Sequence, residues 1–118
     1  MKNFRDLKVW QKAHQLALCI YTTTKHFPKE ELYGLTSQIR RSSMSVPTNI
    51  AEGCGRGSDA DLNRFLYISM GSACELEYQI LLSCDLKFIT KVVYDDLYSQ
   101  VIDIKKMLTS LTKKISTG

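Results

Sequence analysis

Apolar residues recur at spacings of three and four along every long segment of this 118-residue chain, and no segment of useful length alternates apolar with polar residues. Spacings of three and four place side chains on one face of an α-helix, whereas a half-buried strand needs alternation. The sequence therefore predicts an all-α fold without β-strands. Because the length suits one hydrophobic core, we expect residues 1–118 to form a single domain.

Four helices are predicted, at about residues 6–25, 29–52, 59–86 and 92–114. Short connections make consecutive helices antiparallel, which predicts an up-down-up-down four-helix bundle. The faces expected to form the core are Val9, Ala13, Leu16, Ala17, Ile20 and Thr24 in the first helix; Leu35, Ile39, Ser42, Ser43, Val46 and Ile50 in the second; Leu62, Phe65, Leu66, Ser69, Ala73, Leu76, Ile80 and Cys84 in the third; and Val93, Leu97, Val101, Ile104, Leu108, Leu111 and Ile115 in the fourth.

Local signals set the expected boundaries of the second and third helices. Proline at position 28 and the glutamates that follow it favour a helix start there. Pro47 lacks an N–H group and is expected to bend or interrupt the second helix. The glycines at 53, 55 and 57 are expected to end that helix, and Ser58 to cap the third.

The third helix carries a second apolar stripe, on the side opposite its core face. Tyr67, Gly71, Tyr78 and Leu82 share this side with Arg64. A helix that is apolar nearly all round is usually buried all round, but each helix of a four-helix monomer has one side facing out. The stripe therefore predicts a subunit interface and a homo-oligomer, and scattered exposure of tyrosines is the alternative.

Positive charge is concentrated in the first half of the chain. The net charge is +4, with nine Lys and Arg against four acidic residues up to Gly57 and seven against eight afterwards. Arg41 is expected to point away from the core, and two lysines of the first helix lie one turn apart. The candidate nucleic-acid-binding residues are Arg41, Lys8, Lys12, Arg56, Arg64 and Arg5. The alternative is that these side chains are ordinary surface charges that keep the protein soluble.

Arg40 is interpreted differently from its neighbour Arg41. Adjacent helical residues point in different directions, and Arg40 lies on the flank of the core face. Glu77 lies on the flank of the third helix. We therefore expect Arg40 to pair with Glu77 inside the bundle, as a structural contact.

The segment Gly53–Ser58 contains three glycines and Arg56 and invites comparison with a phosphate-binding loop. It follows a predicted helix rather than a strand, and it lacks the Gly-Lys-Ser/Thr ending of a P-loop. Asp59 and Asp61 would also compete with a bound anion. A helix end followed by a tight turn is the favoured interpretation.

No residue set predicts catalysis, a metal site or a cofactor. His14 and His26 have no cysteine or acidic residue at ligand or dyad spacing, and no Glu-x-x-His pair occurs. Cys19, Cys54, Cys74 and Cys84 have no C-x-x-C spacing and are expected to be free thiols. No apolar run approaches the roughly 20 residues that cross a bilayer, so we expect a cytoplasmic protein without membrane contact.

Five ordered motifs resemble the four-helix-bundle proteins encoded in intervening sequences of bacterial 23S ribosomal RNA genes. The motifs span nearly the whole chain: Leu7-x-Val9-Trp10, Phe27-Pro28, Tyr33-Gly34-Leu35-Thr36-Ser37-Gln38-Ile39-Arg40-Arg41, Ser45-Val46-Pro47-x-Asn49-Ile50-Ala51-Glu52-Gly53 and Gly71-Ser72-Ala73-x-Glu75-Leu76-Glu77. Ser42-Ser43-Met44 departs from the alanine-rich sequence that relatives often have there. The charged and amide residues on motif positions are Arg40, Arg41, Asn49, Glu52, Arg56, Glu75 and Glu77.

The resemblance implies an antiparallel four-helix bundle that assembles as a homopentameric ring. It also implies a relation to the accessory variability protein of diversity-generating retroelements, a basic pentamer that binds nucleic acid and a reverse transcriptase. Together with the charges, this predicts a non-enzymatic homo-oligomer that binds structured RNA or DNA, in association with the ribosome or its RNA. A scaffold for a protein partner, without a nucleic-acid ligand, remains the alternative.

Overall fold

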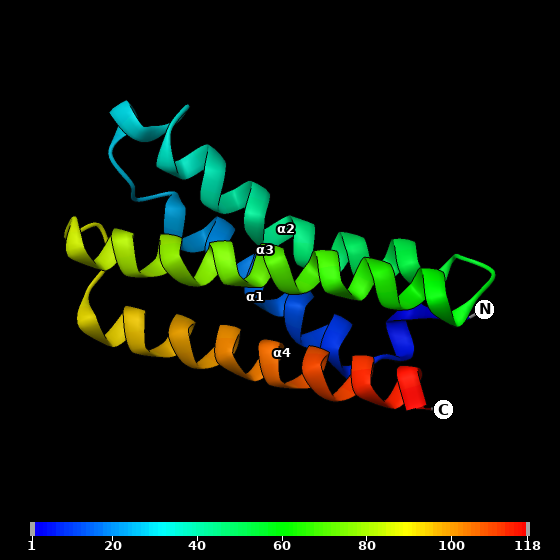
Figure 1. The fold of residues 1–118 in the computed structure, drawn as a ribbon. Helices are drawn as coiled ribbons and strands as arrows, with labels where there is room; N and C mark the ends of the chain where they lie inside the picture. Colours follow the sequence, from blue (N-terminus) through cyan, green and yellow to red (C-terminus); the bar gives the residue numbers. More distant parts are fainter. Residues whose placement is uncertain (1, 118) are drawn as a thin grey trace.

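The computed structural model describes residues 2–117 as four antiparallel α-helices. They are α1 (Lys8–Thr24), α2 (Leu35–Cys54), α3 (Asp59–Asp85) and α4 (Lys91–Thr117), with short 3-10 turns η1 (Phe4–Asp6) and η2 (Lys29–Glu31). The chain runs up, down, up and down through a bundle measuring 45 × 24 × 20 Å (Figure 1). No strand occurs between residues 2 and 117, and the predicted all-α bundle is confirmed.

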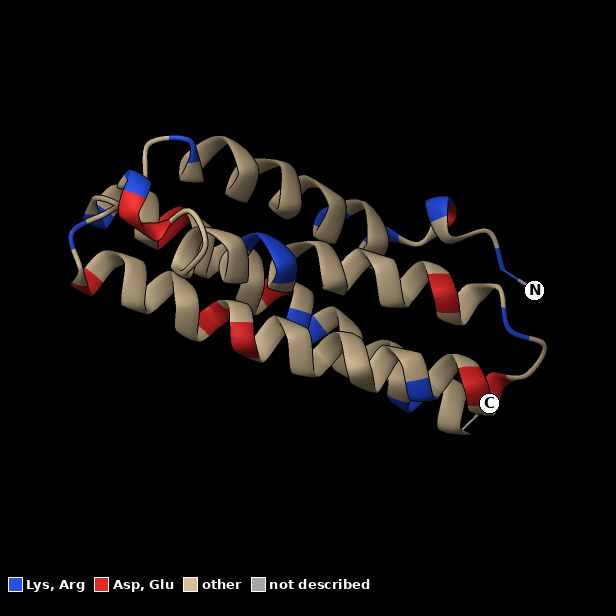
Figure 2. Ribbon diagram, turned by 90° about the horizontal axis from the view of Figure 1, so that it is seen from above, with Lys and Arg blue, Asp and Glu red and all other residues tan. Residues whose placement is uncertain are grey.

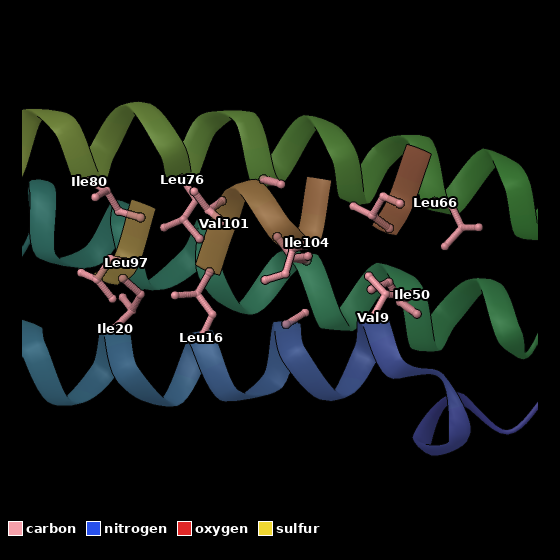
Figure 3. Packing of buried hydrophobic residues seen from close by; sticks show 14 of the residues in the cluster. Val9, Leu16, Ile20, Ile50, Leu66, Leu76, Ile80, Leu97, Val101 and Ile104 are labelled. Atoms are coloured by element: carbon pink, nitrogen blue, oxygen red, sulfur yellow. The ribbon is translucent and has the colours of Figure 1, made fainter. Parts of the chain in front are cut away.

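The core consists of the faces that the apolar spacing predicts. All six expected positions of α1 are buried, and Ile20, Leu66, Ile80 and Leu108 are completely inaccessible to solvent. Side chains from all four helices meet along the bundle axis (Figure 3). Leu35, Cys84, Val93, Leu111 and Ile115 are only partly buried, because they lie toward the ends or edges of the bundle.

The start of α2 differs from the prediction. Pro28 opens the separate turn η2, and α2 begins only at Leu35, after Gly34. The Glu31 carboxylate accepts a hydrogen bond from the Leu35 N–H at 3.2 Å and so caps the helix. Glu31, predicted to lie in the first turn of the helix, therefore caps α2 from outside, because the intervening backbone turns at Gly34.

Pro47 does not interrupt α2, which continues from Leu35 to Cys54. The Ser69 hydroxyl of α3 donates a hydrogen bond to the carbonyl oxygen of Val46, directly before the proline. Gly53 also lies within α2 and does not end it. A Cβ atom at Gly53 would lie only 2.9 Å from the Cβ of Phe65, so this glycine allows α2 and α3 to approach closely.

The other boundaries follow capping residues. The Ser58 hydroxyl accepts a hydrogen bond from the Asp61 N–H at 3.1 Å, as the sequence predicts for the start of α3. At the start of α4, the Thr90 hydroxyl accepts from the Val93 N–H at 3.2 Å. Helix α4 continues to Thr117, slightly beyond its predicted end. The amino end of α1 and the carboxyl end of α4 consequently lie at the same end of the bundle (Figure 1).

Candidate nucleic-acid interface

The α1–α4 groove, a shallow channel between these two helices, contains two neighbouring hollows. The central hollow has a volume of about 630 Å³ and is lined by Lys8, Gln11, Lys12, Gln15, Gln100 and Asp103. The terminal hollow has a volume of about 390 Å³ and is lined by Leu7, Lys8, Val9, Lys106, Met107, Ser110, Leu111 and Lys114. Helices α1 and α4, the first and the last, pack less extensively on each other than the three sequential pairs do, which leaves this side of the bundle open.

Four lysines and one aspartate line the two hollows. Lys8 and Lys12 are the predicted pair on α1, and Lys106 and Lys114 join them from α4. Between residues 2 and 117, none of these four lysines has a carboxylate within ion-pair distance. The groove therefore carries an excess of positive charge, with four lysines against the single aspartate Asp103.

Sequence reasoning missed Lys106 and Lys114. The second half of the chain has no excess of Lys and Arg over Asp and Glu, so the charge distribution along the sequence does not mark its lysines as a basic surface. The predicted antiparallel topology could have identified them, because it makes α1 and α4 neighbours. The end of α4 carries four lysines, and it lies beside the start of α1, where Arg5, Lys8 and Lys12 are found.

Arg56 and Arg64 are held in a local cluster around one aromatic ring. Their guanidinium carbons lie 4.8 and 4.5 Å from the ring centroid of Phe65. Each arginine also lies near a carboxylate, Glu52 at 3.3 Å and Asp61 at 3.7 Å. These contacts balance both positive charges locally, so this cluster contributes less to an anion-binding surface than the α1–α4 groove.

The remaining predicted contact residues lie apart from one another. Arg5 lies in η1 with its guanidinium 4.6 Å from the centroid of the Phe4 ring. Arg41 is exposed on α2, and no ion pair to it occurs among residues 2–117. Lys and Arg positions occur on all four helices (Figure 2). Within one subunit, the structure brings Lys8 and Lys12 together in the groove and does not bring Arg41 or Arg64 to them.

The predicted pair between Arg40 and Glu77 is not formed. The Arg40 Nε group donates to the Thr24 hydroxyl at 2.7 Å, and its guanidinium lies 5.0 Å from the Tyr21 ring centroid. Glu77 instead accepts a hydrogen bond from Lys105 Nζ at 2.7 Å, which raises the pKa of Lys105. Arg40 thus links α2 to α1, whereas Glu77 links α3 to α4. The prediction was wrong because the flank of α2 that carries Arg40 faces α1.

A row of polar contacts joins α2 to α3. The Ser42 hydroxyl donates to Glu75 at 2.8 Å, and the Ser72 hydroxyl donates to the Ser45 hydroxyl at 2.9 Å. The Asn49 amide donates to the same Ser45 hydroxyl at 3.0 Å. Ser45 and Ser72, from the fourth and fifth motifs, therefore bind one another across a helix interface, which gives both a structural role.

The outer face of α3 is exposed in the single subunit. Tyr67 and Tyr78 are 61% and 60% exposed, and Ile68 and Leu81 add exposed apolar area that the sequence stripe did not include. A Cβ atom at Gly71 would have no neighbour within 4 Å, so nothing inside the subunit requires glycine there. Leu82 is only partly exposed and is the least accessible member of the predicted stripe.

Candidate metal ligands and cysteine thiols occur along the described part of the chain. No group of three or more His, Cys, Asp or Glu side chains with metal-binding geometry occurs among residues 2–117. The four cysteines are free, and burial raises the pKa of the Cys54 thiol.

Over residues 2–117, no helix has both the length and the apolar content that would let it cross a membrane.

The geometry defines an antiparallel four-helix bundle with a lysine-lined groove on one side and an exposed apolar helix face elsewhere. The sequence model of the 23S rRNA-intervening sequence protein family matches residues 5–110. Since the match covers most of the chain, the chain belongs to this family, as its motifs indicated.

A solved structure supports the same assignment. The chain is similar to a protein with unknown function of the S23 ribosomal protein family from Bacteroides thetaiotaomicron, with 30% sequence identity and a TM-score of 0.83. The similarity covers 89% of this chain and 95% of that one. No curated protein matches the chain.

Proposed function

We propose that this protein is a non-enzymatic, cytoplasmic homo-oligomer that binds structured RNA or DNA through phosphate contacts. The observation that carries the proposal is the α1–α4 groove, where Lys8, Lys12, Lys106 and Lys114 stand without carboxylate partners among residues 2–117. Phosphate binding grows with the number of cations that engage the backbone. The name of the family makes RNA of the ribosome the first nucleic acid to test.

Assembly strengthens this proposal. The exposed face of α3, formed by Tyr67, Ile68, Gly71, Tyr78 and Leu81, offers apolar area that a second copy would cover. Several copies would present several lysine grooves to one nucleic acid, and linked binding events raise the overall affinity. The resemblance of the motifs implies a pentamer, which we retain as the expected number of copies.

A protein-interaction scaffold is the second candidate function. It is favoured by a hollow of about 530 Å³ at the opposite end of the α1–α4 groove, where Leu18, Cys19, Val92 and Val93 form much of the lining. Val92 is 80% exposed in the subunit. A partner that binds there would depend on apolar contact, and its affinity would change little with salt.

The salt dependence of binding separates the two functions. We expect affinity for a ribosomal RNA hairpin to fall steeply as salt rises. The double variant Lys8→Gln and Lys12→Gln should flatten the log–log salt slope by about two units, one for each lost phosphate contact. Its control is Lys25→Gln with Lys29→Gln, which removes the same charge from exposed positions outside the two hollows.

Fluorescence anisotropy measures both slopes, and light scattering checks that the assembly of each variant is unchanged. Equal slopes for the two double variants would show that the groove is not the binding surface. Absence of salt-dependent binding to any RNA or DNA would refute the proposed function and leave the scaffold.

A further inference from the structure

We infer that the central hollow of the α1–α4 groove binds one unpaired guanine base of the nucleic acid. This inference rests on the proposed function and names the class of ligand at the same site. The hollow measures about 630 Å³, within the range of about 300 to 1,000 Å³ typical of small-ligand sites. It therefore has room for a nucleobase together with its sugar.

The chemistry of the hollow differs from that of a simple phosphate site. A site for phosphate alone needs cations and N–H donors, but Asp103 of α4 lines the same hollow as Lys8 and Lys12 of α1. No cation lies within ion-pair distance of Asp103 among residues 2–117. The exposed Asp103 carboxylate repels phosphate and accepts hydrogen bonds, so the ligand group expected to face it in a complex is a hydrogen-bond donor.

Guanine presents the donors that a carboxylate accepts best. Its Watson–Crick edge carries N1–H and N2–H side by side, and a carboxylate can accept both bonds with its two oxygens. Cytosine and adenine offer a single amino group, and uracil offers a single ring N–H. The carboxylate of Asp103 therefore selects guanine over the other three bases.

Three glutamines complete the hydrogen-bonding capacity of the hollow. Gln11 Nε2 donates to the Arg5 carbonyl at 2.8 Å, and Gln100 Nε2 donates to Asp96 at 3.0 Å. These bonds hold two of the amides in place. The Gln15 amide makes no hydrogen bond within residues 2–117 and is available to the sugar or to the base. Lys8 and Lys12 stand beside it on the same helix to contact the flanking phosphates.

Recognition of a Watson–Crick edge requires an unpaired base. In a duplex that edge is occupied, and sequence-specific recognition of RNA is directed mainly at loops, bulges and single strands. The hollow thus fits a guanosine in the loop of a hairpin or in a single strand. This requirement is compatible with a structured RNA as the overall ligand.

The test compares a short oligouridylate with the same strand carrying one central guanosine, by fluorescence anisotropy on the intact protein. A bidentate contact is worth about 1 to 3 kcal/mol of discrimination, which corresponds to at least about fivefold tighter binding of the guanosine strand. Strands with adenosine or cytidine at that position should show no such gain. A fully paired duplex should bind equally well with and without the guanosine.

Asp103→Asn gives a result that a general charge effect cannot mimic. Removal of the negative charge should tighten binding to the plain oligouridylate, because repulsion of phosphate disappears. The same change should abolish the preference for guanosine, because the asparagine side chain offers only one acceptor oxygen. The control Asp85→Asn removes an exposed charge at the far end of α3 and should leave the preference intact.

Equal binding of the two strands by the unaltered protein would overturn the inference. So would retention of the preference in Asp103→Asn, or a gain from guanosine in the paired duplex as large as the gain in the single strand. In each of these cases, a salt slope that is flatter by about two units in the Lys8 and Lys12 double variant would leave the proposed function standing. Absence of salt-dependent binding to every strand would instead refute the proposed function itself.

Discussion

Gly53 of α2 lies directly against Phe65 of α3, so closely that a Cβ atom on the glycine would come within 2.9 Å of the Phe65 Cβ and 3.2 Å of the Leu62 carbonyl oxygen. The contact lies at the end of the bundle where α2 turns into α3. It makes this glycine a packing residue, although its position in a glycine-rich segment resembles a helix end.

Gly53→Ala should therefore destabilise the fold. Overpacking of a tight contact typically costs about 1 to 3 kcal/mol. Alanine recovers up to about 1 kcal/mol through its better helix propensity. Because the 2.9 Å approach to Phe65 is shorter than any ordinary carbon–carbon contact, we expect the overpacking cost to exceed this recovery and to leave a net loss. Urea unfolding followed by circular dichroism would measure the change, and unaltered or increased stability would contradict the close packing of α2 on α3.

Gly71→Ala is the matched control, with the opposite expected sign. Gly71 lies within α3, where an added Cβ has no neighbour within 4 Å. The substitution should raise stability by about 0.5 to 1 kcal/mol through helix propensity alone. The measurement belongs at low protein concentration, where contacts between subunits contribute least.

Ser72→Ala should weaken the α2–α3 interface. It removes the donor of the hydrogen bond to the Ser45 hydroxyl, and an intramolecular hydrogen bond contributes about 0.5 to 1.5 kcal/mol. The Asn49 amide still donates to Ser45, so the fold should survive. Denaturant unfolding gives the loss. Stability equal to that of the parent protein would show that this motif residue does not act through the interface.

Double-mutant cycles should distinguish the observed partners of Arg40 and Glu77 from the predicted ones. Substitution of Glu77 and Lys105 by alanine should reveal a coupling of up to about 1 kcal/mol, since the pair is partly exposed. The Arg40 and Glu77 cycle should show no coupling, because they contact different helices. Comparable coupling in the two cycles would contradict the observed geometry.

The contribution of the Glu77–Lys105 pair should also depend on pH. The hydrogen bond from Lys105 to Glu77 raises the pKa of the lysine in the folded state. A raised pKa means that the folded protein binds this proton more tightly than the unfolded protein does. The resulting stabilisation is complete at pH values below the ordinary lysine pKa, and it disappears as the pH rises through the raised pKa. The coupling measured at neutral pH should thus vanish in strong alkali, and a coupling that grows with pH would have the wrong sign.

Thiol labelling should report on assembly through α3. Cys74 is exposed on α3 near Gly71 and Tyr78, whereas Cys19 of α1 lines the hollow that α1 forms with α4. In a variant that retains only Cys74, the rate of reaction with Ellman's reagent should fall as protein concentration rises. A variant that retains only Cys19 serves as the reference and should react at a constant rate. Protection of Cys19 instead of Cys74 would indicate that the subunit interface lies on the α1–α4 side of the bundle.

The candidate site was only partly predictable from the sequence. Lys8 and Lys12 were identified because they lie one turn apart on the same helix, which is a local relationship. Lys106 and Lys114 complete the groove from residues far along the chain, and their positions depend on how α4 lies against α1. Arg40 and Glu77 failed as a pair for the same reason, because helical spacing gives a direction around one helix but does not identify the neighbour that lies there.

The amino-acid sequence by itself determined the all-α class, the core faces, the cap at Ser58 and the family, since each depends on residue spacing or on motifs within a short stretch of chain. Only the tertiary structure decided that Gly53 packs against Phe65, that Arg40 binds Thr24, and that lysines of α1 and α4 share a groove. The physical reason is distance along the chain. Periodicity fixes which side of a helix is buried, whereas the partner of each exposed or flanking side chain depends on the packing of whole helices against one another.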